Sequence, residues 1–516
     1  MKGGLRQSMA WLHTWVGLLL GWLLFLVFCT GTASYFQDEI TRWMQPEVHG
    51  LRDVTRGAEG AIAYLQKHAA NAEQWTIQLP GHRAVATTAF WKEKGETFAN
   101  WRDHEFLVDG EGHKVEARDT LGGWRLYRMH FDLYYVPVLW ARWAVGLAAM
   151  FMLVAIISGV ITHKKIFADF FTLRFGKGQR SWLDGHNLSA VLALPFHLMI
   201  TYTGLVTLAS MYMPWGIAAA YEKPTQYYAD AFGTADTPAR SGHAVPLAPI
   251  GGMIEQARAA WHGADPGNIF IPVPGDANAV VKITRGTDEG MDTRGETLTF
   301  DAATGAMQAR PPARGPARAT ESVMVGLHAG RYAPLLLRWF YFLCGLAGTA
   351  MVATGLVLWT SKRRQALPDP ARPYFGFRLV ERLNIATIAG LPFGMACYFL
   401  ANRLLPTGVV DRPGWETHSL FIGWGAVALV ACLRRPVKRA WVETLSVAAA
   451  GFFAVPIVDM MTTDRGLFVS LWHGDLVFAS FDLLMFAFAA LLAYGAWKVH
   501  NRKEAVRVRR KKEAIA

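Results

Sequence analysis

Eight apolar segments, each long enough to form a membrane-spanning helix, constrain this chain more than any other feature. About 20 apolar residues in a helix cross the roughly 30 Å of hydrocarbon in a bilayer. The segments are 11–34, 138–162, 186–212, 335–360, 383–402, 416–433, 440–460 and 476–498. Because 52% of the residues are hydrophobic and only 18% are charged, a soluble enzyme of several domains is excluded. We predict a membrane all-α helical bundle of about eight transmembrane helices in the lipid bilayer.

Basic residues set the expected orientation of this bundle. Lys and Arg cluster after every second segment, and such clusters are typical of cytoplasmic loops. They are Lys164, Lys165, Arg174, Lys177 and Arg180; Lys362, Arg363 and Arg364; Arg434, Arg435, Lys438 and Arg439; and the tail residues Arg507, Arg509, Arg510, Lys511 and Lys512. We therefore expect a multi-pass protein of the bacterial inner membrane with both termini in the cytoplasm. The clusters also account for the excess of 52 Lys and Arg over 40 Asp and Glu, so no nucleic-acid partner is expected.

Two long connections, 36–135 and 214–330, are predicted to form small α+β domains in the periplasm. Each has a helix-like stretch followed by short β-like runs that end in a turn rich in Asp and Gly, at 106–115 and 298–307. The predicted order is a first transmembrane helix 1–35, domain 36–135, helices two and three with a basic loop 136–213, domain 214–330, helix four 331–365, a four-helix extension 383–498 and a basic tail 499–516.

The first four apolar segments contain an internal repeat. His13 lies 18 residues before Gly31 of a Thr-Gly pair, and His186 lies 18 residues before Gly204 of another. The second and fourth segments match each other through Arg142-Trp143 with Ser158-Gly159, and Arg338-Trp339 with Thr354-Gly355. We interpret the glycine pairs as small residues at helix-packing positions. Both copies begin on the same side, so they are parallel repeats related by a pseudo-two-fold axis along the membrane normal.

This axis arranges four histidines in two pairs. It relates His13 to His186 near the cytoplasmic surface, and His130 to His328 near the periplasmic surface. Two neutral imidazoles from opposite sides are the axial ligands that a six-coordinate b-type haem iron needs. The four cysteines form no CxxCH motif for covalent attachment. The cofactor expected is therefore haem b, two or more per chain.

Two further histidines, His197 and His163, lack a counterpart in the repeat. His197 lies 11 residues after His186, about three helical turns along one face, so it is a candidate ligand nearer the membrane centre. His163, beside Lys164 and Lys165, is a candidate partner for a haem propionate or an alternative ligand. A lone membrane histidine is more often a packing or interfacial residue. The repeat favours ligation only for the four paired histidines.

Several motifs occur together over about residues 5–365. They are Leu12-His13-Thr14-Trp15-Val16-Gly17-Leu18, Leu183-Asp184-Gly185-His186-Asn187, the Thr-Gly pairs, and the ends 108–112 and 300–305. Through them the chain resembles the PepSY-associated transmembrane family of iron-regulated bacterial membrane proteins. The resemblance implies two PepSY-like domains, a role in siderophore-iron uptake, and a likeness to haem-containing ferrisiderophore reductases. It also implies that the four paired histidines match the family's membrane histidines. The stretches 162–171 and 194–204 are similar to one branch, which implies a role for His163 and His197.

The function predicted is transmembrane electron transfer that ends in reduction of a ferric siderophore or another ferric chelate. The sequence has no GxGxxG dinucleotide fold, Walker loop or HExxH helix, so a separate donor such as quinol or a cytoplasmic flavoprotein must supply electrons. No catalytic residue is assigned. One alternative is a PepSY-domain sensor, assembly factor or protease regulator without redox catalysis. A second is a transporter, since parallel repeats also build carriers, although no charged pair is evident at a helix centre.

Overall fold

The computed structural model describes residues 4–50, 52–96, 104–163, 172–174, 176–232, 238–308, 310, 314–370 and 372–502. The loop residues Lys164 and Lys165 and the basic tail from 503 onwards lie outside these ranges. The chain divides into two units, Met1–Ala366 and Leu367–Ala516, and each is described by itself.

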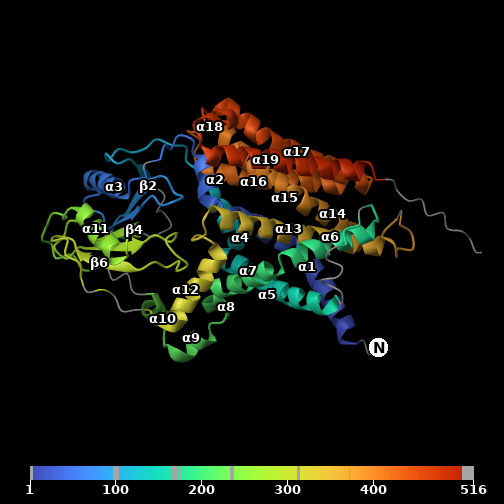
Figure 1. Ribbon diagram of the computed structural model, residues 1–516, viewed down its shortest axis with the longest axis horizontal. Coiled ribbons are helices and arrows are strands. Elements are labelled where there is room, and N and C mark those ends of the chain that lie inside the picture. Colours follow the sequence, from blue (N-terminus) through green and yellow to red (C-terminus); the bar gives the residue numbers. More distant parts are fainter. Residues whose placement is uncertain are drawn as a thin grey trace, which may run out of the picture. The chain divides into compact units, whose positions relative to one another are not determined.

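Helices long and apolar enough to cross a membrane are the main elements of both units (Figure 1). In the described residues there are seven: α1 (Leu5–Ser34), α5 (Val138–Thr162), α13 (Leu335–Arg364), the pair α14–α15 (Phe375–Leu404), α16 (Arg412–Leu433), α17 (Val437–Thr462) and α19 (Leu476–His500). The chain is therefore a multi-pass membrane protein, as its hydropathy predicted.

The predicted third span, 186–212, is not one straight helix. It consists of α6 (Gln179–Leu192) and α7 (Leu194–Thr207), which are bent by 67°, followed by α8 (Ala209–Tyr212). Pro195 in the first turn of α7 explains the break, because proline has no N–H and its ring clashes with the preceding turn. The expectation that His186 and His197 share one face of a continuous helix is therefore wrong.

Six strands form one antiparallel sheet in the order β3-β2-β1-β4-β5-β6. They are β1 (Gln74–Gln78), β2 (Thr87–Lys92), β3 (Glu105–Val108), β4 (Pro266–Pro272), β5 (Val280–Arg285) and β6 (Thr297–Asp301). The segments 36–135 and 214–330, treated above as two domains, each give three strands to this sheet. Pairing of β1 with β4, for example Trp75 with Ile271, satisfies backbone groups that two separate sheets would leave open at an edge.

Two helices, α3 (Val54–His68) and α11 (Ile250–Ala260), pack against the sheet (Figure 1). Leu65 and Met253 from these helices and Ile77, Ile269 and Phe300 from the strands are buried in one hydrophobic core. Alternate side chains of β2 are buried, as expected for a sheet with one covered face. The two halves of the sheet therefore share a core as well as hydrogen bonds.

Short helices connect the sheet to the spans in the first unit. α2 (Gln37–Met44) follows α1, while α4 (Gly122–Asp132) and α12 (Pro316–Ala329) lead from the sheet to α5 and α13. The Glu39 carboxylate of α2 accepts hydrogen bonds from two arginines. Arg83, which lies in the connection between β1 and β2, donates at 2.7 Å, and Arg338 of α13 is the second donor. One half-buried carboxylate thus links the sheet to the membrane helices.

The second unit is a helical bundle that buries charge. It contains α14 (Phe375–Ile388), α15 (Gly390–Leu404), α16, α17, α18 (Leu467–His473) and α19. Arg403 and Asp459 form a fully buried ion pair with 2.7 Å between Nε and Oδ1, and Arg412 forms another with Glu416. Asn402 donates to Glu416 at 2.7 Å and accepts from Arg403 at 2.6 Å. The pair of Arg403 and Asp459 could not be predicted from the sequence, because the two residues are 56 residues apart. Arg412 and Glu416 are only four residues apart, but they lie at the start of α16 and not at a helix centre.

Candidate functional site

Two histidine pairs lie in the first unit. The first pair, His13 of α1 and His186 of α6, has ring centroids 6.1 Å apart and 71° between the ring planes. The second pair, His130 of α4 and His328 of α12, has centroids 6.0 Å apart and 35° between the planes. The structure thus brings together the same partners that the repeat relates to each other.

A backbone carbonyl of a neighbouring helix holds each of these rings at Nδ1. The bonds join His13 to Ala155 at 2.9 Å, His186 to Met351 at 2.8 Å, His130 to Val27 at 2.7 Å and His328 to Ile200 at 3.0 Å. A carbonyl oxygen can only accept, so Nδ1 carries the proton in a neutral ring. Nε2 is then the nitrogen with a free lone pair in all four histidines.

The glycines of the repeat explain why these carbonyls are accessible. Each accepting carbonyl lies four residues before one of them, namely Gly159, Gly355, Gly31 and Gly204 respectively. In an α-helix the N–H of residue i bonds the carbonyl of residue i−4, and the missing side chain leaves room for the imidazole as a second donor. A Cβ at Gly31 would lie 2.6 Å from the His130 ring, and one at Gly204 would lie 2.8 Å from His328. The sequence interpretation of these glycines as helix-packing residues therefore missed their more specific contact.

The spacing within each pair suits a single iron atom. A metal–imidazole bond is about 2.0 Å long and the ring centre lies about 1.1 Å behind the nitrogen, so two axial imidazoles have centres about 6 Å apart. A carbonyl at the other ring nitrogen is the usual partner that orients a ligating histidine. In the residues described, no group of three or more His, Cys, Asp or Glu side chains is placed to hold a metal. A haem iron needs only two protein ligands, and each pair offers two.

Electrostatics favours neutral imidazoles in the second pair, which lies outside the spanning helices. Burial lowers the pKa of His130, although its bond to the Val27 carbonyl opposes the shift. Burial, together with the neighbouring His130, lowers the pKa of His328 to about 3. Both rings are therefore neutral near pH 7, as metal ligation requires.

The two pairs lie at different depths along α1. His13 is on this helix, and Val27, whose carbonyl holds His130, follows 14 residues later. At 1.5 Å per residue the two levels are about 21 Å apart. This is closer than the roughly 30 Å that opposite edges of the hydrocarbon would give.

Comparison with known proteins places these residues in a family. Residues 10–362 match the model described as the PepSY-associated TM region. The chain belongs to the PepSY-associated TM family. It is also similar to the uncharacterized protein PA4219 of Pseudomonas aeruginosa, with 26% identity over 378 residues that cover 69% of this chain and 90% of that protein. All six candidate histidines of this PepSY-associated TM protein lie within the matched residues, whereas the second unit lies beyond them.

The two remaining candidates in the family region are placed differently from the four paired histidines. His197 is 1% exposed. Its Nε2 donates to the Cys344 carbonyl at 3.3 Å, whereas the paired histidines bond their carbonyls through Nδ1. Its ring contacts Phe28 and Phe196. His163 ends α5, and its Nε2 lies 2.9 Å from the Asn187 amide nitrogen. The ring contacts of His197 are thus with phenylalanines, whereas each paired histidine contacts another imidazole.

Proposed function

We propose that this protein is a transmembrane b-haem electron-transfer protein that reduces a ferric siderophore or another ferric chelate. The observation that supports it best is the two pairs of neighbouring imidazoles, with ring centroids 6.1 and 6.0 Å apart and every Nδ1 bonded to a carbonyl. A haem group bound at each pair would supply one-electron iron chemistry, whose potential depends on the axial ligands and their hydrogen bonds. Two sites about 21 Å apart along α1 fit a path across the membrane.

The chain's own residues would bind and orient the cofactor. Each histidine offers Nε2 as a ligand, and its carbonyl partner fixes the ring plane and raises the basicity of the ligand. Each glycine keeps the helix surface flat where an imidazole must approach. These are binding and positioning roles, and the proposal assigns no proton-transfer residue.

The second pair is the natural exit for electrons in this proposal. The helices that carry it, α4 and α12, lead directly from the six-stranded sheet. Basic residues follow α13 and α16, and they favour a cytoplasmic location for the C-terminal ends of these two helices. The N-terminal end of α13, which the sheet precedes in the chain, would then lie on the periplasmic side together with the sheet. A ferric chelate reduced there would release iron more easily, because hard oxygen ligands hold Fe(II) less tightly than Fe(III).

Spectroscopy of the purified protein tests the cofactor. We expect a pyridine haemochrome assay to give two b-type haems per chain, and a ferric trihydroxamate to reoxidise the reduced protein while a ferrous trap captures Fe(II). His473→Ala is a matched control, because this exposed histidine of α18 lies in the second unit. A colourless preparation from haem-replete cells would rule out the proposal.

Topology is tested separately. Reporter fusions at Gly110 and Gly305, which lie in the turns after β3 and β6, should be active only as periplasmic reporters. Activity of a cytoplasmic reporter at either position would reverse the orientation and exchange the entry and exit sides.

The transporter alternative gains one observation, the buried ion pairs of the second unit. These charges bind each other and Asn402, and they lie outside the residues matched by the family model. They give no reason for the paired imidazoles of the first unit. Electron transfer accounts for those imidazoles directly, so we favour it.

A further inference from the structure

His197 of α7 has one ring nitrogen without a hydrogen bond. The side chain is 1% exposed, and its Nε2 donates to the Cys344 carbonyl at 3.3 Å. A neutral imidazole that donates from Nε2 has an unprotonated Nδ1, and this buried atom has no partner at hydrogen-bond distance among the described residues. Buried polar atoms normally have a partner. The Nδ1 atom of His197 is therefore an open acceptor inside the membrane bundle.

The repeat shows that this imidazole belongs to one copy only. A spacing of 173 residues separates His13 from His186, and the same spacing relates His197 to Leu24. Leu24 of α1 is 5% exposed, so an apolar side chain is buried at the corresponding place in the first copy. Packing at this position does not need an imidazole, and the ring of His197 is therefore available for a chemical role.

His197 lies next to the second histidine pair. It precedes Ile200, whose carbonyl holds His328, by three residues, which is about 4.5 Å along α7. Its ring also contacts Phe28, which is adjacent in α1 to the carbonyl that holds His130. A charge on the His197 ring would act on the second site through protein, where charges interact more strongly than in water.

The other titratable groups around this part of α7 are neutral or already bound. The helices α1, α5, α6, α12 and α13 pack against α7. Their ends near His197 carry two proposed haem ligands, two arginines, two thiols and two phenols, namely His186, His328, Arg142, Arg338, Cys29, Cys344, Tyr35 and Tyr341. The arginines bind Asp132 and Glu39, and thiols and phenols are ordinarily protonated near pH 7. Imidazole is the side chain that ordinarily titrates between pH 5 and 8, so His197 is the candidate proton acceptor in this set.

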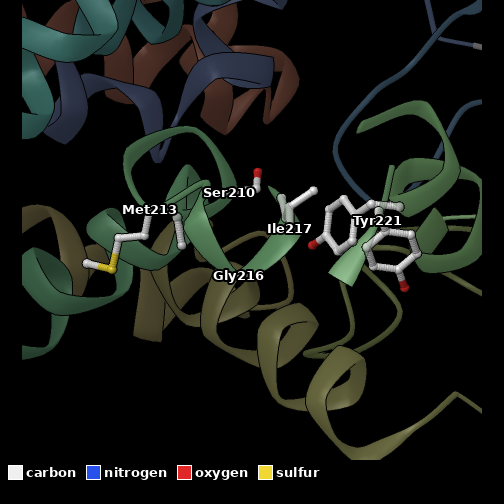
Figure 2. A pocket seen from close by; sticks show the side chains of 7 residues that line it. Ser210, Met213, Gly216, Ile217 and Tyr221 are labelled. Atoms are coloured by element: carbon white, nitrogen blue, oxygen red, sulfur yellow. The ribbon is translucent and has the colours of Figure 1, made fainter. Parts of the chain in front are cut away.

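The hollow that follows α7 in the chain is not a competing proton site. Residues of α8, α9 (Trp215–Ala220) and α10 (Pro224–Phe232), with the turns between them, line this hollow (Figure 2). All of its lining residues are uncharged. Its wall begins at Ala209, 12 residues after His197, which corresponds to about 18 Å along a helix.

We propose that Nδ1 of His197 takes up a proton when an electron reaches the second site. This inference rests on the proposed function, because it requires a haem at the second pair. For each electron that the quinol or flavoprotein donor supplies to that site, one proton moves from water to Nδ1, and both leave when the electron passes to the ferric chelate. The carbonyls of Cys344 and Ala190 lie against the ring, and they are acceptors for the two N–H groups of an imidazolium.

Redox titration at a series of pH values tests this proposal. The parent protein is His13→Ala in nanodiscs, in which the second haem alone should remain. We expect its midpoint potential to fall by up to about 59 mV per pH unit between pH 5 and 8, which is a tenfold change in proton concentration converted for one electron. His197→Gln keeps an N–H for the Cys344 carbonyl but has no basic nitrogen, so the potential of this variant should hardly depend on pH.

Two further variants separate titration from packing. His197→Leu makes the second copy resemble the first and should also remove the pH dependence. Leu24→Ala is the matched control, because it disturbs packing at the equivalent position of the first copy without removing an imidazole. Its potential should depend on pH as the parent's does.

The outcomes distinguish this inference from the proposed function. Equal pH dependence in His197→Gln and the parent, no pH dependence in the parent, or its loss in Leu24→Ala overturns the proton site. Absence of the second haem from His197→Gln also overturns it and assigns Nδ1 to a metal. In each of these cases haem in the parent leaves the proposed function standing. A parent protein without haem refutes both, so haem content is measured first.

Discussion

In the first unit, four imidazoles between helices each use Nδ1 to bind a carbonyl and keep Nε2 as an acceptor. In the second unit, guanidinium and carboxylate groups are buried more deeply, but they bind each other, as Arg403 and Asp459 do with no exposure of either side chain. The two units therefore treat buried polarity differently. Imidazoles that keep one nitrogen without a hydrogen bond can bind a ligand through it. Charged groups that neutralise one another mainly determine how helices pack.

This comparison predicts different consequences for damage to the two units, beginning with the largest. Asp459→Leu leaves the buried Arg403 without its carboxylate, and removal of one partner of a buried ion pair costs about 3–5 kcal/mol. We expect the second unit to unfold at a clearly lower temperature or to fail to accumulate. Thermal unfolding in nanodiscs, followed by labelling of the half-buried Cys397, measures the change.

The double variant Arg403→Met with Asp459→Leu is the control. Replacing both charges by apolar side chains of similar size is often neutral or stabilising, so stability should recover. If the double variant is as unstable as Asp459→Leu alone, the pair does more than neutralise its own charges, and the contrast between the units weakens.

Loss of a paired histidine should remove one haem and leave the fold. Under the proposed function, His13→Ala and His186→Ala should each reduce haem content from two to one, and the double variant should lose no more, since both act on one site. His130→Ala and His328→Ala should behave alike at the other site. Haem stoichiometry and redox titration identify which site is lost. Different sites lost in His13→Ala and His186→Ala would contradict the pairing.

The sequence was sufficient to predict seven of the eight spans and to relate the histidines whose rings lie close together in the structure, because hydropathy and an internal repeat are visible in one chain. It was insufficient for features that depend on tertiary contacts. The joining of β1 to β4 requires two strands almost 200 residues apart to meet. The bend before Pro195 is a different case, because the proline that explains it was visible in the sequence. The carbonyls that hold the imidazoles were also missed, although the glycines four residues later were noticed as a pattern.

Those glycines give a graded prediction. A Cβ at Gly31 or Gly204 would lie 2.6 or 2.8 Å from an imidazole, whereas one at Gly159 or Gly355 would lie at 3.2 Å. Gly31→Ala and Gly204→Ala should therefore displace the second-pair rings and weaken haem binding about 10–100-fold, the range seen when partners that orient a metal ligand are lost. Gly159→Ala and Gly355→Ala should have a smaller effect. Titration of haem into the haem-free variants measures the difference, and equal losses at all four positions would show that close contact is not the cause.

The smallest effect on haem should come from His197, because its ring contacts phenylalanine rings whereas each paired ring contacts a second imidazole. Its Nε2 bonds the Cys344 carbonyl, and its buried Nδ1 has no hydrogen-bond partner among the described residues. Its ring contacts Phe28 and Phe196, so it packs among aromatic side chains. His197→Ala should retain both haems and lose about 1–3 kcal/mol of stability through the cavity and the lost hydrogen bond. His197→Leu, which refills most of the space, should recover part of that loss. Absence of one haem in either variant would assign His197 to a third or more central site, with its unbonded Nδ1 as the ligand atom.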